Sequence, residues 1–317
     1  MKLAILDDYQ GVALNSVDWS EVSKRVDITV FKDHLHDEGL IAERLKDFEI
    51  ICAMRERTPF PRSLFLKLPN LRLLVSSGMR NLGIDVNSAK ERGIIVCGTK
   101  SVGRPTAELA WGLILGLARN ISKEDENVKH GRWQSSVGMG LEGKTLGIAG
   151  LGNLGKRMAE IGKAFKMNII AWSQNLTEER CLEVGAKLVT KEELMKQSDI
   201  ITIHLILSDR SRRTFGKKEL NLMKPSAYII NTSRGPIIDE EELVNVLKKN
   251  TIAGAGIDVF SIEPLPENNP FISLKNILLT PHLGYVEGEN YLSYFKGYIE
   301  AVTAFLDGKP KNFISGY

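Results

Sequence analysis

Residues 146–155 read LGIAGLGNLG, a short apolar run that leads into three closely spaced glycines. Because a helical pattern follows at once, the stretch predicts a strand, a tight turn and the start of a helix. Gly150 can make the turn, Gly152 places no side chain between phosphate oxygens and the backbone N–H groups, and Gly155 lets the helix pack closely on the strand. An anion at this turn lies at the positive end of the helix. The expected dinucleotide-binding residues of the stretch are Gly150, Gly152, Asn153, Leu154 and Gly155.

Size and composition limit the classes of protein to which the chain can belong. Its 317 residues favour about two domains. The 42 basic and 39 acidic side chains leave a net charge of +3, which is too small to indicate a nucleic-acid-binding surface. The longest apolar run, residues 109–118, is shorter than the roughly 20 residues that cross a bilayer. We expect neither a nucleic-acid partner nor a membrane partner.

Three cysteines, Cys52, Cys97 and Cys181, are widely separated and have neither a CxxC spacing nor a nearby histidine pair. An odd number of isolated cysteines is typical of a reduced protein rather than of a disulfide framework. No signal-peptide core can be drawn at the N-terminus. The sequence therefore predicts a cytoplasmic protein without a metal site.

Short apolar and β-branched runs alternate with helix-length segments, which is typical of parallel α/β sheets. The expected strands form two series, separated by a long helical stretch at residues 106–129. The first series is 2–6, 28–31, 50–54, 71–75 and 94–97. The second series is 145–149, 169–172, 200–204, 228–231, 254–259 and 277–279. Two α/β units are therefore predicted.

Helix-start signals and the C-terminal segment refine this organisation. Thr190 with Glu193, and Asp239 with Glu242, each place a capping side chain three residues before a carboxylate that can bond back to it. A last helix is expected at about residues 289–306. If that helix returns to the first unit, the first domain is discontinuous. The predicted domains are 1–100 with 287–317, and 101–286.

Three ionisable residues stand at the ends of predicted strands in the second unit, where ligands bind in open α/β sheets. They are Arg234, Glu263 and His282. Each alone has an ordinary explanation, as a solvated loop arginine, a loop glutamate or a structural histidine. Together they supply what carbonyl reduction needs, because an arginine stabilises charge on oxygen and an imidazolium delivers a proton. A carboxylate beside His282 favours the imidazolium and fixes the ring.

A hydrolytic triad is the competing chemistry, and the sequence does not support it. No GxSxG elbow occurs, and the cysteines lie in apolar or otherwise unremarkable settings. The expected chemistry is therefore hydride transfer beside a nicotinamide.

Five blocks of sequence, in order, resemble the D-isomer-specific 2-hydroxyacid dehydrogenase family, which includes phosphoglycerate, glyoxylate and hydroxypyruvate reductases. The blocks are GLGNLG at 150–155, SDIITIHL at 198–205, NTSRGPIIDEEEL at 231–243, AGAGIDVFSIEPLP at 253–266 and TPHLG at 280–284. The resemblance implies two doubly wound parallel-sheet α/β domains, with a Rossmann cofactor domain inserted in a flavodoxin-like substrate domain. It also implies a homodimer formed through the cofactor domain.

The resemblance also implies a role for individual residues. Arg234 would bind the substrate, His282 would act as general acid–base, and Glu263 would be the partner of His282. Asp258 would meet the carboxamide side of the nicotinamide. The further residues expected to line the cofactor are Ser173, His204, Thr232 and Gly284.

Two departures from the family pattern affect ligand choice. Ser173 stands where the family often has an acidic residue for the ribose hydroxyls, so a 2′-phosphate is not repelled and either NAD or NADP can serve; the nearest following cation is Arg180. In the substrate loop, residues 78–85 read GMRNLGID, where Arg80 and Gly83 replace a usual glycine and asparagine. The expected substrate-binding residues are Arg55 and the backbone of Ser77, Gly78 and Met79.

The sequence thus predicts an NAD(P)-dependent enzyme that interconverts a small 2-oxo acid and its D-2-hydroxy acid, of the glyoxylate, hydroxypyruvate or 3-phosphoglycerate type. An alternative of a different class is an NAD(H)-sensing binding protein of the corepressor type, which can keep all three polar residues. Formate dehydrogenase is a weaker alternative, because its usual glutamine is replaced by Glu263.

Overall fold

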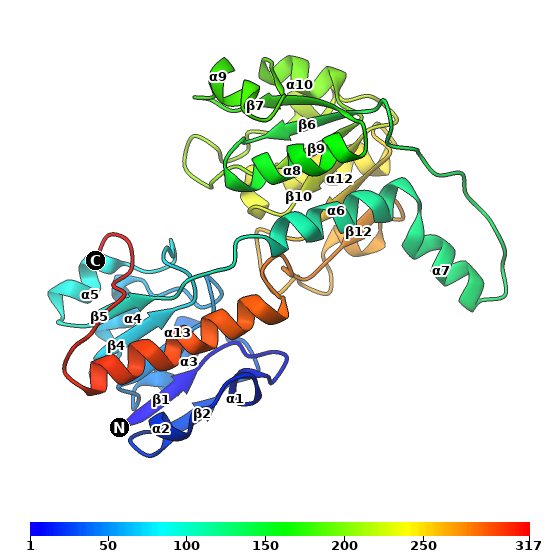
Figure 1. Ribbon diagram of the computed structural model, residues 1–317. Coiled ribbons are helices and arrows are strands. Elements are labelled where there is room, and N and C mark those ends of the chain that lie inside the picture. Colours follow the sequence, from blue (N-terminus) through cyan, green and yellow to red (C-terminus); the bar gives the residue numbers. More distant parts are fainter. The chain divides into compact units, whose positions relative to one another are not determined.

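The computed structural model describes all residues from 1 to 317 and divides them into two compact units (Figure 1). Unit 1 consists of Met1–Val102 and Glu287–Tyr317, and unit 2 of Gly103–Val286. The boundaries predicted from the sequence follow residue 100, two residues before the observed one, and residue 286. None of the helices combines the length and the hydropathy that a membrane span requires.

Unit 1 is built on a five-stranded parallel sheet with the order β2-β1-β3-β4-β5, the flavodoxin-like arrangement. Its inner strands β3 and β4 are buried at every position, as strands covered on both faces are. The C-terminal helix α13 returns to this unit and packs against β4 and β5. The strands are β1 Lys2–Ile5, β2 Asp27–Val30, β3 Ile50–Ala53, β4 Leu73–Ser76 and β5 Ile95–Gly98. The helices are α1 Ala13–Ser16, α2 Ser20–Ser23, α3 Glu38–Leu45, α4 Arg62–Leu66, α5 Val86–Glu91 and α13 Gly288–Leu306.

Unit 2 carries a seven-stranded parallel sheet with the order β12-β11-β10-β9-β6-β7-β8. The order reverses direction at β6, which is the pattern of a doubly wound dinucleotide-binding sheet. The strands are β6 Thr145–Ala149, β7 Asn168–Trp172, β8 Lys187–Leu188, β9 Ile200–Ile203, β10 Tyr228–Asn231, β11 Gly254–Ile257 and β12 Ile277–Leu279. The helices are α6 Pro105–Ala118, α7 Ile121–Lys129, α8 Asn153–Ala164, α9 Glu178–Leu182, α10 Lys191–Gln197, α11 Lys217–Leu220 and α12 Glu240–Lys248, with short 3-10 helices η1 Gly235–Ile237 and η2 Pro270–Ser273.

The prediction of two parallel α/β sheets is confirmed, and every expected strand is present within two residues of its predicted bounds. The helical stretch predicted at 106–129 is present and consists of two helices. Asn120 adopts a left-handed conformation, with φ of +53°, and ends α6 before α7 begins. Asparagine is one of the few residues that tolerate this conformation. Strand β8, with only two residues, was not predicted because it is too short to show a pattern.

The two predicted capping boxes have different outcomes. The box at Thr190 and Glu193 is present with both of its hydrogen bonds. At the start of α12 only one hydrogen bond of the predicted box forms. In this bond the Asp239 side chain accepts the Glu242 N–H. The N–H of Asp239 donates instead to the Phe215 carbonyl at 3.0 Å, so no carboxylate needs to satisfy it.

The parallel sheet of unit 2 explains why its functional candidates gather at one edge. Five neighbouring strands, β12, β11, β10, β9 and β6, all point their carboxyl ends the same way. The residues that follow these ends include His282, Asp258, Thr232, His204 and Gly150, respectively. Open α/β sheets bind ligands at this edge, at the point where the strand order reverses.

Candidate active site

The glycine-rich turn after β6 has the geometry that a dinucleotide needs. Gly150 has a φ of +102°, and a Cβ built on it would lie 2.6 Å from the His204 carbonyl oxygen. A Cβ on Gly155 would lie 2.1 Å from the Gly150 oxygen, so helix α8 packs directly on the turn. Only glycine fits at these two positions. In contrast, a Cβ on Gly152 would meet nothing within 4 Å, which leaves its face open.

The N-terminus of α8 completes this turn. Gly152 is its N-cap and offers no side chain to the first N–H groups, which include those of Asn153 and Leu154. Such groups bind anions well, because their positive partial charges add along the helix. The first turn contains no acidic residue that would repel a phosphate.

Two buried polar atoms near the same strand ends have no partner within the protein. They are Nδ1 of His204, after β9, and the hydroxyl oxygen of Thr232, after β10. Nε2 of His204 pairs with the Thr202 hydroxyl at 2.8 Å, and burial lowers the pKa of His204 to about 4, so the ring is neutral. Unsatisfied buried groups are costly and call for an explanation. Together with the open glycine turn, they fit an NAD(P) cofactor that supplies the missing hydrogen bonds.

Ser173 follows β7 beside the glycine-rich turn. The N–H of Gly150 donates to the carbonyl of Trp172, the residue before Ser173, at 2.8 Å. Arg180, in α9, donates from Nη2 to the Leu151 carbonyl at 3.3 Å. Arg180 is therefore held against the turn. Ser173 and Arg180 are therefore both near the same segment of the turn, Gly150 and Leu151.

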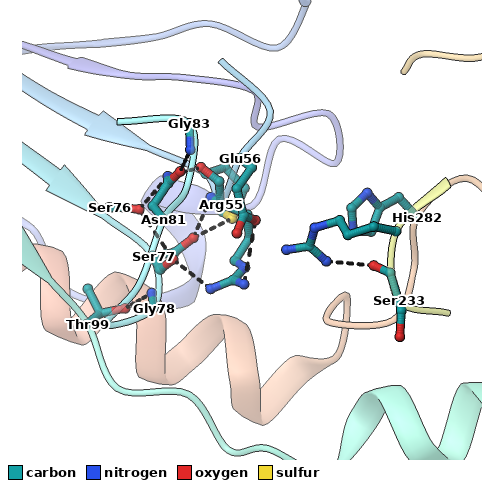
Figure 2. A network of polar contacts seen from close by, with 12 residues as sticks. Arg55, Glu56, Ser76, Ser77, Gly78, Asn81, Gly83, Thr99, Ser233 and His282 are labelled. Carbon is teal, nitrogen blue, oxygen red and sulfur yellow. Dashed lines mark hydrogen bonds and ion pairs between the residues drawn. The ribbon is translucent and has the colours of Figure 1, made fainter. Parts of the chain in front are cut away.

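Arg234 projects from a turn that is fixed on both sides. Asn231 closes the turn, because its side chain accepts the Ser233 N–H and donates to the Arg234 carbonyl, both at 3.0 Å. The Ser233 hydroxyl donates to the Ile203 carbonyl at the end of β9. The guanidinium donates through Nη1 to the Ser233 carbonyl at 2.7 Å (Figure 2). The side chain of Arg234 is thus oriented before any ligand binds.

His282 and Glu263 form a close pair. Nδ1 of His282 lies 2.5 Å from Oε2 of Glu263, and the two side chains are 16% and 27% exposed. Because an ionised carboxylate can only accept, Nδ1 carries a proton, and the bond to Glu263 leaves Nε2 as the other ring nitrogen. His282 has a φ of +53°, an uncommon conformation for a histidine. The ring of Tyr285 packs edge-on against it, at 5.5 Å between centroids.

Asp258 holds the backbone that carries His282. Its carboxylate is fully buried and accepts the Thr280 hydroxyl and the N–H groups of Leu283 and Gly284, at 2.6, 2.7 and 2.9 Å. Its carbonyl accepts the His282 N–H at 2.8 Å. Burial raises the pKa of Asp258. Both carboxylate oxygens are therefore engaged by the turn, so any contact of Asp258 with a nicotinamide would be an additional one.

In unit 1, Arg55 lies over the loop after β4. Its N–H donates to the Ser77 hydroxyl at 2.8 Å and its Nη1 to the Ser77 carbonyl at 3.1 Å (Figure 2). A Cβ on Gly78 would lie only 2.0 Å from Nη1, so the guanidinium packs directly on that glycine. Arg55 itself has a φ of +52°. Left-handed non-glycine residues concentrate at functional sites.

The loop after β4 offers fewer free N–H groups than the sequence suggested. The N–H of Ser77 donates to Ala53 O, and that of Gly78 donates to the Thr99 hydroxyl, both at 3.0 Å. Of the three expected donors, only the Met79 N–H has no hydrogen bond within the protein. Of the backbone groups predicted to bind an anion, only that of Met79 is therefore available beside the Arg55 guanidinium.

Asn81 shapes this loop and was not singled out in the sequence. Its side chain donates to the Arg55 carbonyl at 2.6 Å and to the Ser76 hydroxyl at 2.9 Å, and it accepts the Gly83 N–H at 2.8 Å (Figure 2). The one feature of the sequence that could have pointed to Asn81 is its position in a loop that departs from the family pattern. Thr99 gave no signal, because its partner Gly78 is 21 residues away.

Comparison with known proteins identifies relatives of this chain. The sequence model described as D-isomer specific 2-hydroxyacid dehydrogenase, NAD binding domain, matches residues 111–284. A glyoxylate reductase of Aeropyrum pernix is 40% identical over 263 residues, which are 80% of this chain and 78% of the relative. A hydroxypyruvate reductase of Blautia hydrogenotrophica is 31% identical and matches 99% of this chain and 100% of its own length. A phosphoglycerate oxidoreductase of Vibrio cholerae has a crystal structure that superimposes with a TM-score of 0.92 at 38% identity, over 97% of this chain and 99% of that one.

Proposed function

This chain belongs to the D-isomer-specific 2-hydroxyacid dehydrogenase family, and we propose that it interconverts a small 2-oxo acid and its D-2-hydroxy acid of the glyoxylate, hydroxypyruvate or 3-phosphoglycerate type. The family model and the relatives identify the chain as an NAD(P)-dependent dehydrogenase with a small-molecule substrate. The observation that carries the proposal is the 2.5 Å pair of His282 and Glu263, on the sheet edge that also carries Arg234.

The proposed catalytic residues are Arg234, Glu263 and His282. In the reducing direction, Arg234 binds the oxo acid and stabilises the negative charge that develops on the carbonyl oxygen. His282 gives the proton on Nε2 to that oxygen, while Nδ1 keeps its bond to Glu263. Glu263 stabilises the imidazolium before the transfer and fixes the ring afterwards. A bound NADPH or NADH supplies the hydride.

We assign the cofactor to the glycine-rich turn and to the polar groups at the neighbouring strand ends. The pyrophosphate would bind at Gly150, Gly152 and the start of α8. His204 and Thr232, each with an unsatisfied buried atom, would donate to or accept from the nucleotide. The complete proposed set is Gly150, Gly152, Asn153, Leu154, Gly155, Ser173, His204, Thr232, Asp258 and Gly284.

We assign Arg55 and the Met79 N–H to the anionic part of the substrate. Arg55 is only partly exposed and is held by Ser77, and its Nη2 lies 3.5 Å from the Glu56 carboxylate, so its guanidinium has a fixed position. Ser77 and Gly78 would act through loop shape rather than through their N–H groups, because those groups already have partners. A guanidinium held in this way can bind an additional negative group on the substrate.

Turnover measurements with a panel of substrates test this proposal. Purified protein should oxidise NADPH or NADH when it is given glyoxylate, hydroxypyruvate or 3-phosphohydroxypyruvate, and should leave aldehydes and ketones that lack a carboxylate unreduced. The absence of a carboxylate removes the group that the arginine residues bind. Equal turnover of carboxylate-free ketones would contradict the assignment of these residues to substrate.

The Ser173→Asp variant tests the proposed ribose site. A carboxylate at residue 173 would face the 2′-phosphate, so we expect the dissociation constant of NADPH to rise at least tenfold, about 1.4 kcal/mol, while that of NADH changes less than about threefold. Fluorescence titration of both cofactors measures this difference. Ser173→Ala is the control, because it removes the hydroxyl without adding charge. An unchanged NADPH affinity in Ser173→Asp would place the ribose elsewhere.

We further propose a homodimer through the region after α6. In unit 2, α7 and the segment that follows it extend away from the sheet (Figure 1). Trp133 and Val137 in this segment are 77% and 98% exposed. Large apolar side chains exposed together mark a protein–protein contact.

Light scattering after size-exclusion chromatography tests the dimer. The wild type should elute with twice the chain mass of 35.3 kDa. The double variant Trp133→Lys, Val137→Asp should shift toward the monomer, because it places charges in the proposed contact. Leu182→Asp is the control, since Leu182 is also exposed but lies on α9. A wild type that elutes as a monomer, or a double variant that stays dimeric, would contradict this contact.

A further inference from the structure

Glu240, the first residue of α12, has a carboxylate that the helix itself does not need. Asp239 is the N-cap and already accepts the Glu242 N–H. Glu241, the next residue, is exposed and carries the same charge on the same turn. Glu240 is instead partly buried, and burial raises its pKa. A helix-capping or dipole role therefore does not explain where this side chain lies.

The Glu240 carboxylate reaches the chain segment that carries Glu263. We refer to residues 258–266 as the Glu263 loop. Oε1 of Glu240 accepts the Ser261 N–H at 2.7 Å. Oε1 of Glu263 accepts the preceding N–H, that of Phe260, at 2.8 Å. Two consecutive N–H groups of the loop are thus each held by a carboxylate.

The same peptide is pressed against the turn of Arg234. A Cβ on Gly235 would lie 2.2 Å from the Phe260 carbonyl carbon and 2.5 Å from the Ser261 nitrogen. No side chain fits there, so the two backbones are in direct contact. The Phe260–Ser261 peptide is therefore held on one side by the Arg234 turn and bound through its N–H to Glu240.

This peptide and the one directly before it, which carries the Phe260 N–H, link the members of the proposed catalytic set. Glu263 bonds Phe260 with one oxygen and His282 with the other. A shift of the peptide would move Glu263, and through it the ring of His282, relative to Arg234. The Phe260 N–H donates to Glu263, which belongs to the Glu263 loop. The Ser261 N–H donates to Glu240, which lies outside it.

We propose that Glu240 is a positioning residue, whose hydrogen bond to Ser261 keeps Glu263 and His282 in register with Arg234. This inference rests on the proposed function, in which His282 and Glu263 are the proton-transfer pair. What Glu240 supplies is an acceptor at a fixed place. A neutral acceptor of the same length should serve nearly as well.

Matched variants at residue 240 test the inference. Glu240→Met keeps the length of the side chain but removes the acceptor, so kcat should fall about tenfold, with an unchanged dissociation constant for the cofactor. Glu240→Gln keeps an amide oxygen for the Ser261 N–H and should stay within about threefold of the wild type. Glu241→Met, one residue along the same helix turn, should leave kcat unchanged. Thermal unfolding confirms that each variant is folded.

A spectroscopic measurement separates positioning from a general loss of structure. In protein with isotopically labelled histidine, the Nδ1 proton of His282 should resonate far downfield because of its short bond to Glu263. Glu240→Met should shift or broaden this signal, and Glu240→Gln and Glu241→Met should preserve it. A His282→Ala sample assigns the resonance.

The outcomes distinguish the inference from the proposed function. If His282→Ala retains wild-type turnover, the proposed function is wrong. If His282→Ala is inactive but Glu240→Met has wild-type kcat and an unchanged histidine signal, the positioning role is wrong. If Glu240→Gln is as slow as Glu240→Met, the hydrogen-bond acceptor is not what Glu240 supplies, and the inference is likewise overturned.

Discussion

His282→Ala should reduce 2-oxo acids about a thousandfold more slowly than the wild type, and should bind NADPH or NADH with unchanged affinity. The imidazole is the group on this sheet edge that can hold a proton on one nitrogen while a carboxylate orients it through the other. Without it, the proton must come from water. The proposed pyrophosphate site, at Gly150, Gly152 and the start of α8, follows β6 rather than β12, so we expect the variant to keep it. Stopped-flow absorbance of the reduced nicotinamide measures the rate, and fluorescence titration measures the affinity.

A second histidine supplies the control for this prediction. His130 also pairs with a carboxylate, that of Glu126 at 3.2 Å, but it is exposed at the end of α7. His130→Ala should behave as the wild type. A rate for His282→Ala within threefold of the wild type would show that His282 is not the proton donor.

Arg234→Gln should lower kcat/KM for the oxo acid by about 10² to 10³, the usual loss when a donor to a developing oxyanion is removed. The guanidinium is held in place by its own bond to the Ser233 carbonyl and by the turn that Asn231 closes. Glutamine can donate a hydrogen bond but carries no charge. Arg234→Lys restores the charge without the planar fork, so it should recover only part of the loss. Initial rates over a range of oxo-acid concentrations measure the effect.

The control for Arg234 is a surface arginine of the same unit. Arg212 is exposed in the loop before Phe215, and Arg212→Gln should leave kcat/KM unchanged. If Arg234→Gln loses no more than Arg212→Gln, the substrate is not bound by Arg234.

The sequence predicted the elements that are set by local pattern. Strand β6 and the glycines after it were predicted correctly, because a buried strand, a turn and a helix start follow each other within ten residues. The pairing of His282 with Glu263 was expected from the family resemblance and is present. These features depend on short segments or on blocks that the family shares.

Features that depend on contacts between distant residues were not predictable. The N–H of Gly78 is occupied by Thr99, and the Ser261 N–H by Glu240, 21 residues away in each case. No periodicity or motif in the sequence predicts a hydrogen bond between residues so far apart. The break between α6 and α7 at Asn120 was missed for another reason: a single left-handed residue interrupts a helical pattern that continues on both sides.

As a dehydrogenase specific for D-2-hydroxy acids, this chain should form a single enantiomer, which chiral analysis of the product can measure. Hydroxypyruvate is the substrate to use, because its reduction gives glycerate, which has two enantiomers. Incubation with NADPH or NADH should yield D-glycerate alone. Formation of L-glycerate or of both enantiomers would contradict this specificity. Tight binding of either dinucleotide without any glycerate would also contradict it, and would support the alternative of a dinucleotide-sensing protein.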